Sequence, residues 1–432
     1  MKVLIICTQF PPDTSIAAKR PYMFAKYLAE YGHDVVVLCS GEITSKIDTS
    51  YNENDTRFRV ITYLSEKQII KPTTSLAHRQ ARLIPSIIRE TAKKVYHALY
   101  EPVYIYKRKR LADYHFQKIK IALENLKNED FDVVFSTFSE LSNVYAGSYA
   151  KALFGCKWIL DFRDRIIQPK NLSWLWNALF RPVERKYVNI ADAVTAVSQD
   201  LFWGTSYPKS KFFTIYNGYD PIEEEQLFPQ NKSKKLSFCY TGLVYGERSI
   251  ALEFLFKTIH SLNDKGLIDV DNISFEYAGQ SEDDLDYLAL KYGLESMVNK
   301  HGYLLSEELK QLQLNSDVFL VLSWNHAKER GVLTGKFYDG VRVHKPILSI
   351  IAGEVSNCEL FRLNNEYNYG FCFEQARDSQ QEEEFESFVL NMYNQKISRG
   401  KVEYQINEEL LEKFKYQNLA KELEQLCFSL LV

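Results

Sequence analysis

Short apolar runs alternate with amphipathic stretches along most of the chain, and this alternation restricts the folds that the chain can adopt. The runs are KVLIIC, DVVVLC, FDVVFS, KWILDF, DAVTAV and FFTIYN in the first half, then KLSFCYTG, SFEYAG, DVFLVLS and PILSII. Each has the length and composition of a buried strand. Between the first two runs, residues 18–32 have helical spacing and end at Gly32. A strand, a helix and a strand in that order predict a parallel sheet with crossover helices.

The alternation restarts after a turn-rich and charged stretch, which indicates two domains. This stretch, residues 217–235, reads NGYDPIEEEQLFPQNKSKK and is typical of a linker. A chain of 432 residues is also too long for one ordinary hydrophobic core. We therefore predict an α/β protein with two doubly wound Rossmann-like domains, residues 1–216 and 236–405. Their strand ends face a central cleft, and residues 406–432 have the pattern of one amphipathic helix.

Several classes of protein are disfavoured by the composition. No apolar run approaches the ~18 residues that span a bilayer, and the first residues lack the cleavage pattern of a secretory signal. The seven cysteines show no CxxC spacing, so we expect no structural zinc site. Cys7, Cys39, Cys239 and Cys372 lie in strand-like runs and are expected to be buried thiols in a reducing cytosol.

Positive charge is concentrated in one segment of an otherwise acidic chain. The formal net charge is -3, but residues 67–120 contain 13 Lys or Arg and three acidic residues, a balance of +10. Tyr96, Tyr100, Tyr104 and Tyr106 interleave with these cations, a mixture suited to a lipid headgroup interface. We predict that the segment docks a cytoplasmic, peripheral protein on an anionic membrane surface. A solvated helical insertion is the alternative, and nucleic acid, the competing anion, is not the expected partner.

Two cations occupy predicted helix starts in the second domain. Arg248 follows the glycine loop TGLVYGERS, and Lys336 begins the helix in GVLTGKFYDGVRVHKPIL. A cation is unfavourable at the electropositive end of a helix unless an anion binds there as well. Two such places predict a ligand with more than one negative charge, such as a diphosphate. Asp339 shares a helix face with Lys336 and is a candidate for ribose hydroxyls, although solvated surface roles explain all three side chains equally well.

The order of several motifs resembles that of a known enzyme family. The motifs are FPPDTSIAAKR, YLAEYGHDVVVL, WILDFRD, ADAVTAVSQDL, IYNGYD, YTGLVYGERS and GKFYDGVRVHKPIL. Together they resemble the family-4 retaining glycosyltransferases, which have the GT-B fold. The resemblance implies that residues 1–216 bind the acceptor, that residues 236–405 bind the nucleotide sugar, and that residues 406–432 cross back to the first domain.

The resemblance also implies a donor site in the second domain. Arg248 and Lys336 would hold the donor diphosphate. The family's first glutamate falls on Gly331, so Glu329 is a substitute candidate for the contact to the donor sugar. The remaining donor-binding candidates are Gly242, Gly246, Gly279, Tyr303, Gly331, Val332, Leu333, Thr334 and Asp339.

Loops of the first domain would hold the acceptor. The candidates are Ser15, Lys19, Arg20, Ser139, Glu140, Asn143, Asp161, Arg163 and Asp164. Many relatives carry a histidine in the loop that corresponds to STFSELSNVYAG, and this chain has none there. Helix-cap or turn roles for that loop, and a structural ion pair within DFRDR, are the alternatives.

The implied reaction is transfer of a sugar from a nucleotide diphosphate, with retention, to a glycan or lipid-linked acceptor. The implied pathway is bacterial surface-polysaccharide synthesis, such as capsule or lipopolysaccharide. Cations and helix amides stabilise a departing diphosphate without a metal. No DxD-type pair lies where a metal-dependent sugar transferase needs one, since the aspartates of DFRD are too widely spaced, so we expect no metal and no other cofactor. The alternative functions are a catalytically silent GT-B protein that binds a nucleotide sugar or a partner enzyme, and a nucleotide-sugar epimerase.

Overall fold

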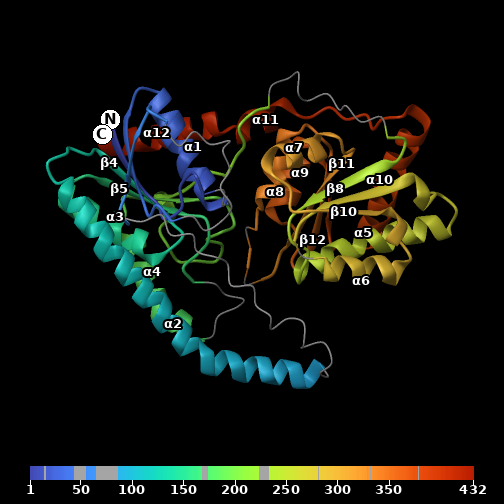
Figure 1. Cartoon of the computed structure of the whole chain (residues 1–432), viewed down its shortest axis with the longest axis horizontal. Helices are drawn as coiled ribbons and strands as arrows, with labels where there is room; N and C mark the ends of the chain where they lie inside the picture. The colour runs from blue at the N-terminus through green and yellow to red at the C-terminus, as the bar shows by residue number, and fades with distance from the viewer. Residues whose placement is uncertain are drawn as a thin grey trace. The chain divides into compact units, whose positions relative to one another are not determined.

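The computed structural model contains two compact units, each built around one parallel sheet (Figure 1). The first unit comprises residues 1–197, 204–215 and 420–432, and the second comprises residues 198–203 and 216–419. The structure describes residues 1–13, 16–42, 55–64, 86–167, 174–222, 233–280, 282–327, 329–330, 332–377 and 379–432, with the backbone alone for 16, 86–100 and 174. The predicted α/β class with two doubly wound sheets is confirmed.

The sheet of the first unit has the strand order β3-β2-β1-β4-β5-β6-β7, and all neighbours pair in parallel. Its strands are β1 (Lys2–Ile6), β2 (Asp34–Cys39), β3 (Arg59–Thr62), β4 (Val133–Phe138), β5 (Lys157–Phe162), β6 (Ala193–Ala196) and β7 (Phe212–Thr214). Its helices are α1 (Ile16–Glu30), α2 (Ser86–Asn125), α3 (Leu141–Phe154), α4 (Trp174–Ile190) and the 3-10 turn Lys209–Lys211. The strand order reverses direction between β1 and β4.

The second unit repeats this plan with the order β10-β9-β8-β11-β12-β13, again parallel throughout. Its strands are β8 (Leu236–Thr241), β9 (Ile273–Ala278), β10 (Val298–Gly302), β11 (Val318–Trp324), β12 (Ile347–Ala352) and β13 (Gly370–Glu374). Its helices are α5 (Glu247–Asp264), α6 (Asp283–Tyr292), α7 (Ser306–Leu314), α8 (Gly335–Arg342), α9 (Glu359–Tyr367), α10 (Ser379–Arg399) and α11 (Glu408–Phe414), with 3-10 turns at Val270–Asn272 and Glu295–Met297. The order reverses between β8 and β11.

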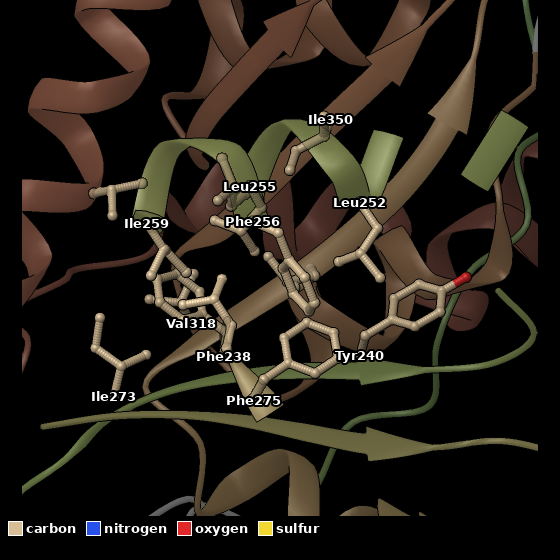
Figure 2. Close-up of a cluster of buried hydrophobic side chains, with 14 of the residues drawn as sticks. Phe238, Tyr240, Leu252, Leu255, Phe256, Ile259, Ile273, Phe275, Val318 and Ile350 are labelled. Carbon is tan, nitrogen blue, oxygen red and sulfur yellow. The ribbon is translucent and has the colours of Figure 1, made fainter. Parts of the chain in front are cut away.

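Helix α5 is fixed to the second sheet by one apolar face. Figure 2 shows its side chains Leu252, Leu255, Phe256 and Ile259 packed among residues of β8, β9, β11 and β12. All four are fully buried, and their spacing places them on one side of a helix. This packing determines where the first turn of α5 lies relative to the strand ends.

The C-terminal segment forms two helices where the sequence predicted one. Helix α11 ends at Phe414 and α12 spans Tyr416–Leu431. Between them, Lys415 has extended backbone angles (φ -67°, ψ 128°) and bridges to Tyr219. The amide of Tyr219 donates to the carbonyl of Phe414 at 3.0 Å, and the amide of Tyr416 donates to the carbonyl of Tyr219 at 3.0 Å. Pairing with a strand-like segment therefore interrupts an otherwise helical pattern.

The predicted basic segment coincides in part with α2, a helix of 40 residues. Residues 67–85 and the side chains of Tyr96 and Tyr100 lie outside the described residues. The helix bends along its length (Figure 1) and contains Pro102, a residue that removes one hydrogen bond from a helix and kinks it. None of the described helices has the length and apolar character that a bilayer-spanning segment requires.

Two of the predicted acceptor residues form an ion pair in the interior of the first unit. Arg20 donates to Asp161 from Nε at 3.1 Å and from a terminal nitrogen at 2.8 Å, and it also reaches the carbonyl of Ile215 at 2.9 Å. The hydroxyl of Thr195 donates to Asp161 at 2.7 Å. The Arg20 and Asp161 side chains are 1% and 0% exposed. Asp161 is therefore paired with Arg20 and not with a residue of DFRDR, and the contacts of both side chains are structural.

Replacing Arg20 with Ala is expected to lower the free energy of unfolding by about 3–5 kcal/mol, because it leaves the Asp161 carboxylate buried without its counter-charge. Urea denaturation measures this change. The control is Asp164→Asn, because Asp164 is exposed and lies just after β5, the strand that contains Asp161. This variant should unfold like the wild type. Unchanged stability of Arg20→Ala together with lost turnover would contradict the structural role.

Candidate functional site

Three loops of the second unit come together where its strand order reverses. Ligands of doubly wound sheets bind at this point, beyond the carboxyl ends of the strands. The amide of Gly242, after β8, donates to the carbonyl of Ala278 at the end of β9, at 2.8 Å. A Cβ on Gly279 would lie 2.1 Å from the Gly242 oxygen, and a Cβ on Gly242 would lie 3.2 Å from Cε of Lys336. The two glycines therefore allow the loops to approach each other and the start of α8.

Arg248 lies in the first turn of α5, after Gly246 in a positive-φ conformation (56°) at the N-cap. Its guanidinium carbon is 5.3 Å from the ring centre of Tyr245 and 5.6 Å from that of Trp324, the last residue of β11. Cation–π contacts of this kind hold a guanidinium without neutralising its charge. Arg248 is thus positioned at the strand ends by two aromatic rings.

The start of α8 is electropositive. Thr334 occupies the N-cap position but makes no side-chain cap, and its hydroxyl oxygen is buried without a hydrogen-bond partner among the described residues. The first turn of α8 contains no acidic residue. Lys336 Nζ lies 3.7 Å from Oδ2 of Asp339, and these two side chains are 24% and 21% exposed. Helix amides and one lysine therefore converge where an anion is readily bound.

The segment that leads into α8 is attached to the sheet. The hydroxyl of Ser323, in β11, donates to the carbonyl of Val332 at 2.9 Å, and Leu333 is buried. Tyr303 follows β10 and is exposed. Gly331 lies outside the described residues. Val332, Leu333 and Thr334 thus form a fixed approach to the helix.

A histidine that the sequence analysis did not consider lies beside Glu329. Backbone hydrogen bonds of 3.2 Å and 3.1 Å join His326 and Glu329. The ring of His326 contacts Glu354 through Nδ1 and approaches Glu247 through Nε2 at 3.2 Å. Hydrogen bonds from the amide of Ala327 and from His326 lower the pKa of Glu354 to about 2. The available signal was a histidine three residues after the predicted strand DVFLVLS.

The equivalent point of the first sheet, between β1 and β4, is occupied by Asn143. This fully buried side chain donates to the Thr8 hydroxyl at 3.1 Å, the Thr137 carbonyl at 3.0 Å and the Ser139 hydroxyl at 3.3 Å. Its hydrogen bonds join the ends of the two strands. Asn143 and Ser139 are therefore part of the framework of this loop.

Glu140 connects the same loop to α2. It stands at the N-cap of α3 without capping it, and its carboxylate accepts a hydrogen bond from Arg108 at 2.7 Å. Of the other acceptor candidates, Lys19 and Arg163 are half-buried and Asp164 is exposed. Ser15 lies outside the described residues.

Comparison with known proteins supports the assignment of the fold. Residues 17–223 match the sequence model of Glycosyltransferase Family 4. Sucrose-phosphate synthase from Thermosynechococcus elongatus is similar at a TM-score of 0.60 and 12% identity, over 100% of this chain and 99% of that chain. The catalytic domain of Arabidopsis thaliana starch synthase IV, bound to ADP and acarbose, is similar at a TM-score of 0.59 and 13% identity, over 100% of this chain and 99% of that chain.

A third similar structure is that of Anabaena HepE in complex with UDP and glucose, with a TM-score of 0.58 and 11% identity over 99% of this chain and 100% of that chain. No curated protein sequence matches the chain. At these identities the solved structures show the fold alone, and the similarity to the family rests on the sequence model, which covers slightly less than half of the chain. From both findings we conclude that residues 17–223 are similar to glycosyltransferase family 4 and that the chain has the GT-B fold.

Proposed function

We propose that the protein transfers a sugar from a nucleotide-diphosphate donor to a glycan or lipid-linked acceptor. The start of α8 carries this proposal: Lys336 lies beside uncapped helix amides and a buried Thr334 hydroxyl that has no partner among the described residues. Arg248 supplies a second cation at the start of α5. The UDP and ADP bound to the similar structures support a nucleotide diphosphate as the ligand class.

In the proposed reaction, the bond between the anomeric carbon and the diphosphate oxygen breaks while the acceptor hydroxyl oxygen bonds to that carbon. The hydroxyl proton passes to the departing phosphate oxygen, and the configuration is retained because attack and departure share one face of the sugar. Negative charge grows on the leaving diphosphate, where Arg248, Lys336 and the α8 amides stabilise it. These groups take the role that a metal ion has in other transferases, so we propose metal independence.

Roles for two acids complete the donor site. Asp339 accepts hydrogen bonds from ribose hydroxyls while it remains beside Lys336. Glu329 contacts the donor sugar, and its backbone pairing with His326 fixes its position after β11. The missing histidine in residues 136–147 favours a silent nucleotide-sugar-binding protein as the second candidate function. Sugar transfer separates the two, and conversion of a free nucleotide sugar without acceptor would instead indicate an epimerase.

The exposed face of α2 supports docking on an anionic membrane, and with it a peripheral place in bacterial surface-polysaccharide synthesis. Its large exposed apolar side chains are Val103, Tyr106, Leu111, Tyr114 and Ile121, and Lys107, Lys109, Arg110 and Lys118 are exposed beside them. Such a mixture lies in a headgroup interface, with rings at the boundary and cations at the phosphates. Arg108 differs from its neighbours because it is turned towards Glu140.

Replacing Arg248 or Lys336 with Ala should each lower kcat by about 10²–10³, or roughly 2.7–4 kcal/mol of transition-state stabilisation, the cost of losing one preorganised charge contact. Release of nucleotide diphosphate from a panel of nucleotide sugars, with acceptor present, measures this. Lys257→Ala, an exposed cation on α5, is the control. Turnover near the wild-type level in both variants would reject the diphosphate site.

Replacing Asp339 and replacing Glu329 should affect different steps of donor binding. Asp339→Ala is expected to weaken binding of free nucleotide diphosphate at least tenfold, because ribose contacts are lost. Glu329→Ala should leave that affinity unchanged and raise KM for the nucleotide sugar. Calorimetry with the nucleotide, followed by donor kinetics, measures both effects. Equal nucleotide affinity in the wild type and Asp339→Ala would contradict the ribose role.

Neutralising Lys107, Lys109 and Arg110 with Gln should weaken binding to anionic vesicles by about 3 kcal/mol at low salt, at about 1 kcal/mol for each basic residue near the surface. Sedimentation with phosphatidylglycerol vesicles and with phosphatidylcholine vesicles measures the change. The same three-Gln replacement at Arg181, Arg185 and Lys186, exposed on α4, is the matched control. Equal binding to both kinds of vesicle would disprove the docking.

A further inference from the structure

Residues 198–203 form a short turn that belongs to the second unit although it follows β6 of the first sheet. A buried carboxylate holds it there: Glu359, at the start of α9, accepts hydrogen bonds from the hydroxyl of Ser198 and from the amide of Gln199 at 3.0 Å and 3.1 Å. Ser198 is 0% exposed and Glu359 4% exposed. The first residues of the turn are therefore fixed to α9.

The turn ends in an exposed aromatic ring. Arg362 donates to the buried carboxylate of Asp200 at 2.9 Å, and the amide of Trp203 donates to the carbonyl of Asp200 at 3.0 Å. Trp203 itself is 60% exposed. The anchored backbone thus holds this large ring in solvent at a fixed place, and tryptophan is a residue type enriched at binding surfaces.

The ring of Trp203 lies beside the loop that carries the proposed sugar contact. The guanidinium carbon of Arg330 is 4.8 Å from the ring centre, and its Nε atom is buried without a hydrogen-bond partner among the described residues. Arg330 directly follows Glu329 in the sequence. The cation–π contact thus keeps the indole next to the position proposed for the donor sugar.

We infer that Trp203 is a carbohydrate-binding platform on which a pyranose ring of the acceptor stacks. This inference rests on the proposed transferase function. The polarised C–H groups of one sugar face match the negative face of an indole. Arg248, Lys336, Asp339 and Glu329 already account for the diphosphate, ribose and sugar of the donor. The acceptor hydroxyl must come into contact with the anomeric carbon, so the acceptor sugar is the part that reaches a ring beside Glu329.

The experiment compares Trp203→Ala and Trp203→Phe with the wild type in transfer from a nucleotide sugar at saturating concentration, with the acceptor concentration varied. The expected result is an acceptor KM raised at least tenfold in Trp203→Ala, a donor KM within twofold of the wild type, and an acceptor KM within about threefold in Trp203→Phe. Tyr287→Ala removes an equally exposed ring from α6 (61% exposed) and should leave both constants unchanged.

Each other outcome has a distinct meaning. Normal transfer with an unchanged acceptor KM in Trp203→Ala, or the same rise in Tyr287→Ala, overturns the platform and leaves the transferase function intact. A raised donor KM with an unchanged acceptor KM assigns the ring to the donor base or sugar and also overturns the inference. Absence of transfer by the wild-type protein overturns the proposed function, and the inference with it.

Discussion

The close approach of the loops after β8 and β9 determines where the second unit can bind an anion. Gly279 has no room for a Cβ because the carbonyl of Gly242 lies against it. Gly242 in turn lies against the side chain of Lys336. Parallel strand order brings these loops to one edge of the sheet, and the glycines remove the bulk that would keep them apart. The diphosphate site proposed here depends on this contact more than on any one charged residue.

The central strands and the edge strand β7 were predicted, whereas the outer strands β3, β10 and β13 were not. Central strands are covered on both faces and read as continuous apolar runs, as in the fully buried β8 and β12. Among the missed outer strands, β3 and β10 are short and largely exposed, as strands with one open edge can be. The sequence of β10, VNKHG, has three exposed residues and no apolar run, so a pattern of hydrophobicity cannot identify it.

In the candidate site, the sequence predicts the placement of side chains at helix starts, but not the contacts between residues that are far apart in the chain. A cation at a helix start is visible in the sequence, as for Arg248 and Lys336. The pairing of Arg20 with Asp161 joins residues 141 positions apart, and local spacing contains no information about it. The contact of Trp203 with Arg330 likewise requires the tertiary structure, because it joins two loops that are adjacent only after the turn has been anchored on α9.

The ion pair between Lys336 and Asp339 is weak enough to leave the lysine able to bind a ligand. Its Nζ–Oδ2 distance of 3.7 Å is long for an ion pair, and both side chains remain partly exposed. Pairs of this kind contribute about 0–1 kcal/mol, whereas a hydrogen bond to a charged group contributes about 1.5–3 kcal/mol. The phosphate proposed at the α8 amides would therefore gain more from the lysine than Asp339 does. Because an ammonium group has three donors, Lys336 can bind the phosphate without leaving Asp339, which keeps the acid in place for a neighbouring hydroxyl.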